Sequence, residues 1–89
     1  VEIESEEDGW AAETENYRLK MKKVKDFAPT GRKGWMGAIY FQAVDLRPDF
    51  KANTDMHLNR DDALSQGQGL MDKYQKELNE FYISIQKPK

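Results

Sequence analysis

The chain contains no cysteine and only one histidine, His57. Without cysteine, its 89 residues form no disulfide, no thiolate zinc site and no thiol nucleophile. No apolar run approaches the ~20 residues that span a bilayer, and no signal-peptide pattern opens the chain. We therefore expect an intracellular, cytoplasmic protein with no membrane partner. The first residue is Val rather than Met, which leaves open a longer parent protein.

The signatures of common enzyme classes are also missing. The sequence has no Walker loop, no dinucleotide fingerprint and no Gly-x-Ser-x-Gly nucleophile motif. Asp55 and His57 alternate onto one side of an expected strand, but two ligands do not complete a tetrahedral zinc site. An EF-hand loop from Asp55 fails, because Arg60 and Gln66 stand where Gly and Glu are needed. We expect no enzyme activity, no catalytic residue, no metal and no cofactor.

The stretch TGRKGWMG (residues 30–37) carries three closely spaced glycines. A Gly-x-x-Gly loop with bases inside resembles the phosphate clamp of KH domains, but that loop joins two helices. Here strand patterns lie on both sides, which favours a hairpin loop over 28–34 in which the glycines supply positive φ. Arg32 and Lys33 at its tip remain free to contact a phosphate.

Charge is segregated along the chain, although the net charge is only −2. Residues 1–15 hold seven acids and no base, whereas residues 16–33 hold seven bases and one acid, Asp26. Val, Ile, Leu and Phe together number 17 of 89 residues, so a folded chain of this composition has a thin core. We predict a flexible acidic arm over 1–15 and a single domain over 16–89. The arm is a candidate competitor for any anion that binds the bases.

Three segments show strand patterns. Apolar and basic residues alternate from 17 to 22, residues 34–46 are rich in aromatic and β-branched side chains, and residues 51–60 alternate again. Lys23-Val24 breaks the first alternation and suggests a bulge or the end of the strand.

The last third of the chain predicts a helix that begins after Asn59. Its apolar stripe has steps of three and four and comprises Leu64, Gly67, Met71, Tyr74, Leu78, Phe81 and Ile85. Because glycine in a helix costs about 1 kcal/mol, Gly67 and Gly69 suggest that the ordered helix begins nearer Leu70. Residues 81–85 alternate, so this pattern does not decide between helix and strand.

The expected fold class is α+β. It is a three-stranded, or possibly four-stranded, antiparallel meander with one long C-terminal helix on one face. The helix would meet Leu19, Met21, Ile39, Phe41, Met56 and Leu58, and the other face would stay open and basic.

Two functions are compatible with this fold. The first is a small non-enzymatic module that binds single-stranded DNA or RNA, since such binders combine cations with aromatic platforms. Its candidate residues are Arg18, Lys20, Lys22, Lys25, Arg32 and Lys33 for phosphates, with Trp35 and Tyr40 for stacking.

The second function is a protein-protein interaction module, such as a small inhibitor, adaptor or subunit domain, that uses the helix and the acidic arm. Apolar residues off the main stripe are typical of an interface and allow a homodimer through the helix. The candidate interface residues are Leu70, Met71, Tyr74, Leu78 and Tyr82.

Overall fold

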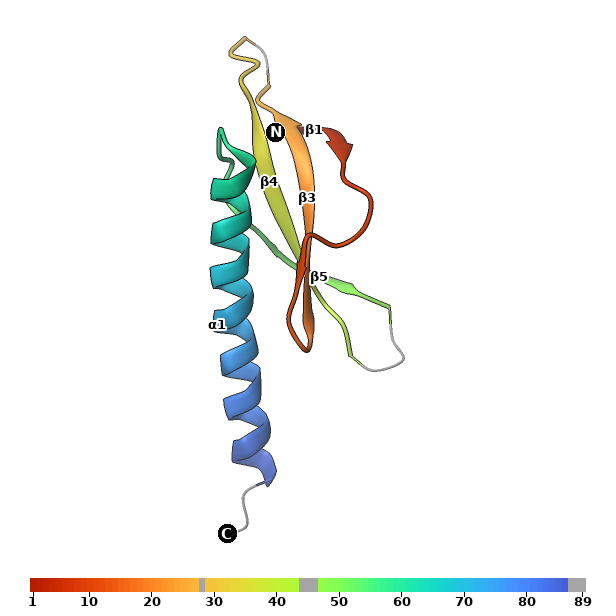
Figure 1. Cartoon of the computed structure of the whole chain (residues 1–89), viewed down its shortest axis with the longest axis vertical. Coiled ribbons are helices and arrows are strands. Elements are labelled where there is room, and N and C mark those ends of the chain that lie inside the picture. Colours follow the sequence, from red (N-terminus) through yellow and green to blue (C-terminus); the bar gives the residue numbers. More distant parts are fainter. Residues whose placement is uncertain (28, 44–46, 87–89) are drawn as a thin grey trace.

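The computed structural model describes residues 1–27, 29–43 and 47–86, the side chain of residue 86 excepted. This part of the chain forms an antiparallel sheet followed by one long helix, α1 (Arg60–Gln86), which confirms the α+β prediction (Figure 1). The strands are β1 (Glu2–Glu6), β2 (Ala12–Glu13), β3 (Tyr17–Lys25), β4 (Lys33–Phe41) and β5 (Asp49–Asn53).

The sheet order is β1-β3-β4-β5, and β2 also pairs with β3. Both β1 and β2 lie along the same strand, β1 opposite residues 22–25 and β2 opposite residues 18–19. Residues that we expected to belong to a flexible arm are thus edge strands in the structure. The described sheet has five strands for this reason, rather than three or four.

The long hairpin of β3 and β4 is the centre of the sheet. Its nine-residue strands stay in register from Tyr17 opposite Phe41 to Lys25 opposite Lys33. The expected strand over 34–46 ends at Phe41, and positions 44–46 lie outside the described residues, as does position 28 of the expected hairpin loop. Gly31 in that loop has a φ of 54°, as the expected turn requires.

The third expected strand, over 51–60, is shorter than its alternation predicts. The strand ends at Asn53, and only a single bridge between Trp35 and His57 follows. Thr54 is buried and uses its hydroxyl to accept a hydrogen bond from the Gly37 N–H (2.9 Å). Gln66 then accepts from the backbone N–H of residue 55 (3.0 Å), which pulls the chain toward the helix. Leu58, expected to face the helix, is instead 65% exposed.

The helix begins at Arg60, earlier than the two glycines suggest. A Cβ on Gly67 would lie 2.7 Å from a methyl carbon of the fully buried Leu19, so glycine is needed where α1 and β3 approach each other. The core around Leu19 also contains Tyr17, Met21, Ile39, Ala63 and Met71. Packing of this stripe outweighs the helix propensity of glycine.

The helix extends past the end of the sheet (Figure 1). Residues 81–85, which the sequence left open between helix and strand, are helical. Phe81 and Ile85 continue the apolar stripe but are 58% and 61% exposed, because no described strand lies beside them. Among the described residues, no helix combines the length and the apolar composition needed to cross a bilayer.

Candidate functional site

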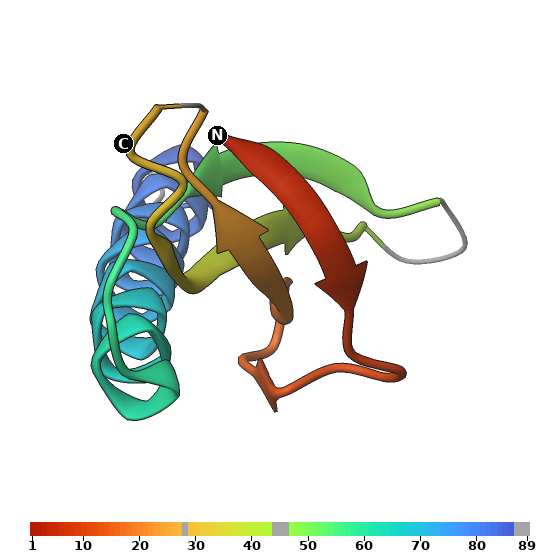
Figure 2. The same ribbon diagram turned by 90° about the horizontal axis from the view of Figure 1, so that it is seen from above.

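The sheet has one face covered by α1 and one face turned away from it (Figure 2). Successive side chains of a strand point to opposite faces. Leu19, Met21 and Ile39 face the helix and are fully buried. Their neighbours along each strand, Arg18, Lys20 and Lys22 of β3 and Tyr40 of β4, therefore lie on the other side, which we call the back face.

Three aromatic rings from different parts of the chain meet on the back face. Tyr40 of β4 and Phe50 of β5 are register partners, and their ring centroids are 5.9 Å apart in an edge arrangement. Trp10, which follows β1, lies edge-on to Tyr40 at 5.5 Å. Edge-to-face contact at this separation is a favourable geometry for aromatic pairs.

Two cations of β3 complete the group. The guanidinium carbon of Arg18 is 5.5 Å from the centre of the Trp10 ring, and the Lys20 ammonium is 5.6 Å from it. Arg18 is also the register partner of Tyr40. We call Trp10, Arg18, Lys20, Tyr40 and Phe50 the aromatic–cation cluster. Phe50 is 57% exposed and the other four are half-buried, so the cluster is reached from solvent.

The eight predicted nucleic-acid residues do not form one surface. Arg18, Lys20 and Tyr40 come together in the cluster. Lys22 shares their face, but it is only 9% exposed and lies opposite Glu6 of β1. Its ammonium is therefore a poor contact for an external phosphate.

The remaining members lie elsewhere. Trp35 packs against the core and has the Lys23 ammonium 5.7 Å from its ring centre, so it lies on the helix side of the sheet, opposite Tyr40. By strand alternation, Lys25 and Lys33 share that side. Arg32 lies in the hairpin loop.

Acidic residues of the first fifteen positions pair with these bases. Glu13 is 3.3 Å from the Arg18 Nε, and Glu4 is 3.6 Å from the Lys33 ammonium. A third acid, Glu7, instead binds the guanidinium of Arg60 at the start of α1, outside the basic segment, through two hydrogen bonds of 2.6 and 2.8 Å. Those bonds lower the pKa of Glu7 below its ordinary value. The basic segment is therefore partly neutralised within the molecule.

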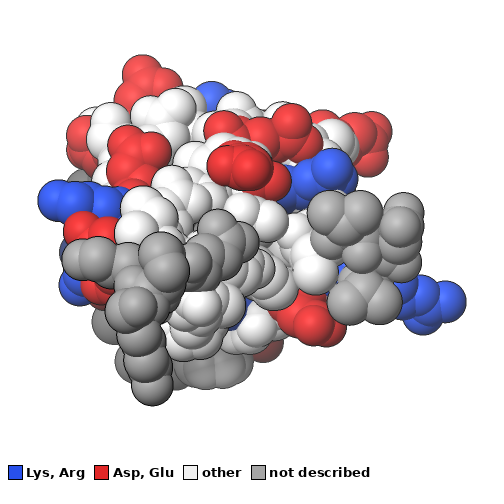
Figure 3. Space-filling model, turned by 90° about the horizontal axis from the view of Figure 1, so that it is seen from below, with Lys and Arg blue, Asp and Glu red and all other residues white. Residues whose placement is uncertain are grey.

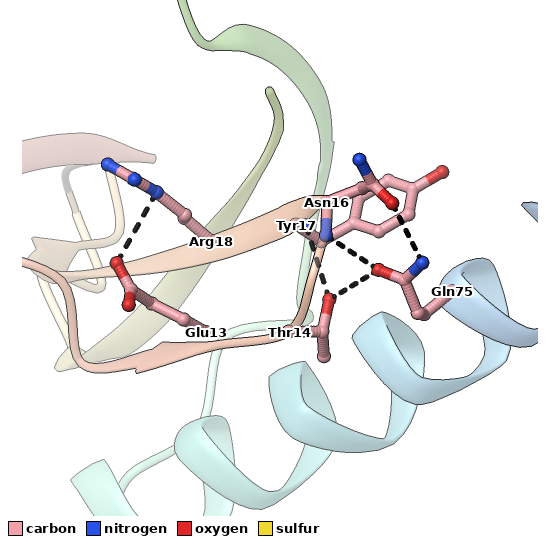
Figure 4. A network of polar contacts seen from close by, with 6 residues as sticks. All are labelled: Glu13, Thr14, Asn16, Tyr17, Arg18 and Gln75. Carbon is pink, nitrogen blue, oxygen red and sulfur yellow. Dashed lines mark hydrogen bonds and ion pairs between the residues drawn. The ribbon is translucent and has the colours of Figure 1, made fainter. Parts of the chain in front are cut away.

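A buried glutamine of the helix holds the turn between β2 and β3, next to the cluster (Figure 4). The Gln75 Oε1 accepts from the Asn16 N–H (2.7 Å) and from the Thr14 hydroxyl (2.9 Å). Its amide donates to the Asn16 Oδ1 (3.0 Å). This network fixes where β3 starts and so positions Glu13 against Arg18.

Sequence reasoning missed two members of the cluster, Trp10 and Phe50. Trp10 is a single large aromatic residue in an acidic stretch. Such a residue is a signal that its ring packs against another part of the protein. Phe50 lies between the expected strands over 34–46 and 51–60, whereas β5 begins at Asp49.

Four of the five predicted interface residues are buried or half-buried. Met71 is 1% exposed, and Leu70, Tyr74 and Leu78 pack against the core. Of these five residues, only Tyr82 is exposed, at 40%.

No protein-family model matches the chain, and no curated protein or solved structure matches it significantly. Among the described residues, no three His, Asp or Glu side chains gather closely enough to hold a metal ion.

Proposed function

We propose that the protein binds single-stranded nucleic acid on the back face of its sheet. The observation that carries the proposal is the contact of Tyr40 with Phe50 beside Arg18 and Lys20. Single-strand binders pair aromatic rings, which stack on bases, with cations that follow the phosphates. A duplex keeps its bases stacked inside and offers such rings no base face.

The roles follow from exposure and charge. Phe50, the most exposed ring of the cluster, is the first stacking surface, and Tyr40 continues it toward β3. Arg18 and Lys20 neutralise phosphates. Only two cations, both on the back face, take part in this site, whereas the sequence suggested six.

Alanine substitution of two exposed phenylalanines tests the role of the ring. F50A removes the outer ring of the cluster, whereas F27A removes a ring of similar exposure in the β3–β4 connection. Titration of a labelled oligonucleotide of about 15 nucleotides should show F50A weakening binding by about fivefold or more, since each stacked base contributes ~1–3 kcal/mol. F27A should bind as the wild type does. Equal effects of the two variants, or a wild type that does not bind, would contradict the proposal.

The exposed end of α1 supports a second candidate function, self-association. Phe81, Tyr82, Ile83 and Ile85 are 40–64% exposed on the last turns of the helix. Figure 3 looks along the molecule from that end and shows uncharged atoms in the middle of the view with most charged side chains around them. Phe81 and Ile85 prolong the stripe that packs on the sheet. A second copy of this chain would cover the stripe where the sheet has ended.

Two isoleucine substitutions test this candidate. I85S alters the stripe, whereas I83S alters an equally exposed residue that helical spacing places off the stripe. Sedimentation velocity over a range of concentrations should show a dimer for the wild type and I83S, and a monomer for I85S. A wild type that stays monomeric throughout would rule this function out.

A further inference from the structure

The segment Asp8–Trp10 bridges the two edge strands β1 and β2 and belongs to neither. It is held at both ends. The Glu7 N–H donates to the Met21 carbonyl (3.0 Å), and the Ala11 N–H donates to the Leu19 carbonyl (2.7 Å). The two hydrogen bonds of the Glu7 carboxylate with Arg60 strengthen the first anchor.

The segment between these anchors has a backbone suited to a hinge. Gly9 has a φ of 77°, a conformation that favours glycine. A Cβ built on Gly9 would meet nothing within 4 Å, so the chain there lies in open space. No ladder pairing of β1 or β2 includes Asp8, Gly9 or Trp10. Strand pairing therefore does not hold this segment between its two anchors.

Trp10 covers the central part of the proposed site. Its ring lies edge-on to Tyr40 and against the charged groups of Arg18 and Lys20. A few residues later, the Glu13 carboxylate lies 3.3 Å from the Arg18 Nε. An aromatic ring and an anion of the same chain thus contact the groups assigned to bases and phosphates.

We infer that Asp8–Trp10 is an intramolecular cover of this site, in which Trp10 takes the place of a base. Beside the cover, the side chain of Glu13 on β2 takes the place of a phosphate on Arg18. The inference rests on the proposed function. A ligand that needs Tyr40 and Lys20 competes with the cover. Its apparent association constant is the intrinsic constant multiplied by the fraction of molecules in which the cover is open. Nucleic acid then binds with outward movement of Trp10.

The direction in which W10A changes the affinity for nucleic acid tests the cover, because a cover and a stacking platform predict opposite changes in affinity. Removing a competing ring should tighten the binding of a labelled single-stranded oligonucleotide by about three- to tenfold. Weaker or unchanged binding would overturn the inference. If F50A weakens binding while W10A also weakens it, Trp10 is part of the platform, and the proposed function survives without the cover. If no form binds, both fail.

A glutamate pair gives an independent test with matched charge. E13Q removes the anion on Arg18, whereas E15Q removes an exposed carboxylate two residues away with the same change in net charge. E13Q should tighten binding more than E15Q does. Equal increases in affinity for E13Q and E15Q would mean that only the overall charge affects binding, and the cover would be rejected.

Fluorescence follows the movement itself and does not depend on the W10A variant. W35F leaves Trp10 as the single tryptophan, since the chain has two. Acrylamide should quench Trp10 more strongly once oligonucleotide is bound, because the ring has left Tyr40. Reduced quenching on binding would show that a base stacks on Trp10 and would overturn the inference.

Discussion

Gly67 of α1 lies so close to Leu19 of β3 that a Cβ at position 67 would come within 2.7 Å of a Leu19 methyl carbon. Leu19 is fully buried, and a Cβ on Gly37 of β4 would meet the same side chain at 2.7 Å. The Leu19 side chain therefore packs between Gly67 of α1 and Gly37 of β4. This contact sets how closely the helix lies on the sheet.

Two glycine substitutions in one helix should change stability in opposite directions. G67A should lower the free energy of unfolding by about 1–3 kcal/mol, because the added methyl overpacks the core. G69A should raise it by up to about 1 kcal/mol, since nothing lies within 4 Å of its Cβ position and alanine favours the helix. Urea unfolding followed by circular dichroism measures both. A stabilising G67A would contradict the packing described for Leu19.

The paired Glu7 and Arg60 predict a dependence of stability on pH. The pKa of Glu7 is lowered by its hydrogen bonds with Arg60, so the pair stabilises the fold above the ordinary carboxyl pKa and loses this effect as pH falls through the lowered value. Both side chains are about one-third exposed, which limits the expected effect of E7Q at pH 7 to about 0.5–1 kcal/mol.

Urea unfolding of the wild type and E7Q at several pH values measures this effect. The difference between them should be full at neutral pH and should shrink as pH falls through the lowered pKa of Glu7. E80Q, which neutralises an exposed carboxylate of the helix, serves as the control. A difference between wild type and E7Q that stays constant with pH would show that charge pairing is not its cause.

The network around Gln75 predicts a larger loss. Q75A leaves the half-buried Asn16 backbone N–H and Thr14 hydroxyl without the oxygen that accepts from them. Orphaned donors of this kind cost about 1–3 kcal/mol. N79A removes only an acceptor at the exposed end of the same network and should cost less. Thermal unfolding of the two variants compares them, and equal losses would mean that the network does not fix this turn.

The sequence predicts the central hairpin and the helix well, because both depend on local periodicity. Alternation marks Leu19 and Met21 as core residues, and steps of three and four mark Met71. The same reasoning underestimates the first turns of the helix, because the propensity of Gly67 is a local quantity whereas its contact with Leu19 joins residues distant in sequence.

The site is less predictable for the same reason. Arg18, Lys20 and Tyr40 were found from alternation within strands that pair locally. Trp10 reaches Tyr40 because β1 and β2 pair with β3, which the charge pattern of residues 1–15 conceals. Phe50 reaches Tyr40 through the pairing of β5 with β4. Trp35 was misplaced as a stacking residue, although alternation along its strand puts it on the same face as Ile39 and Phe41, which we expected to meet the helix.

The salt dependence of single-strand binding tests the central claim most directly. Two phosphate contacts, by Arg18 and Lys20, predict that the logarithm of the association constant falls with the logarithm of salt concentration at a slope of about −1.4. K20Q should reduce the slope to about −0.7, and K76Q, on the exposed side of the helix, should keep the wild-type value. A flat dependence, an unchanged slope for K20Q or a preference for duplex would contradict a binding site on the back face.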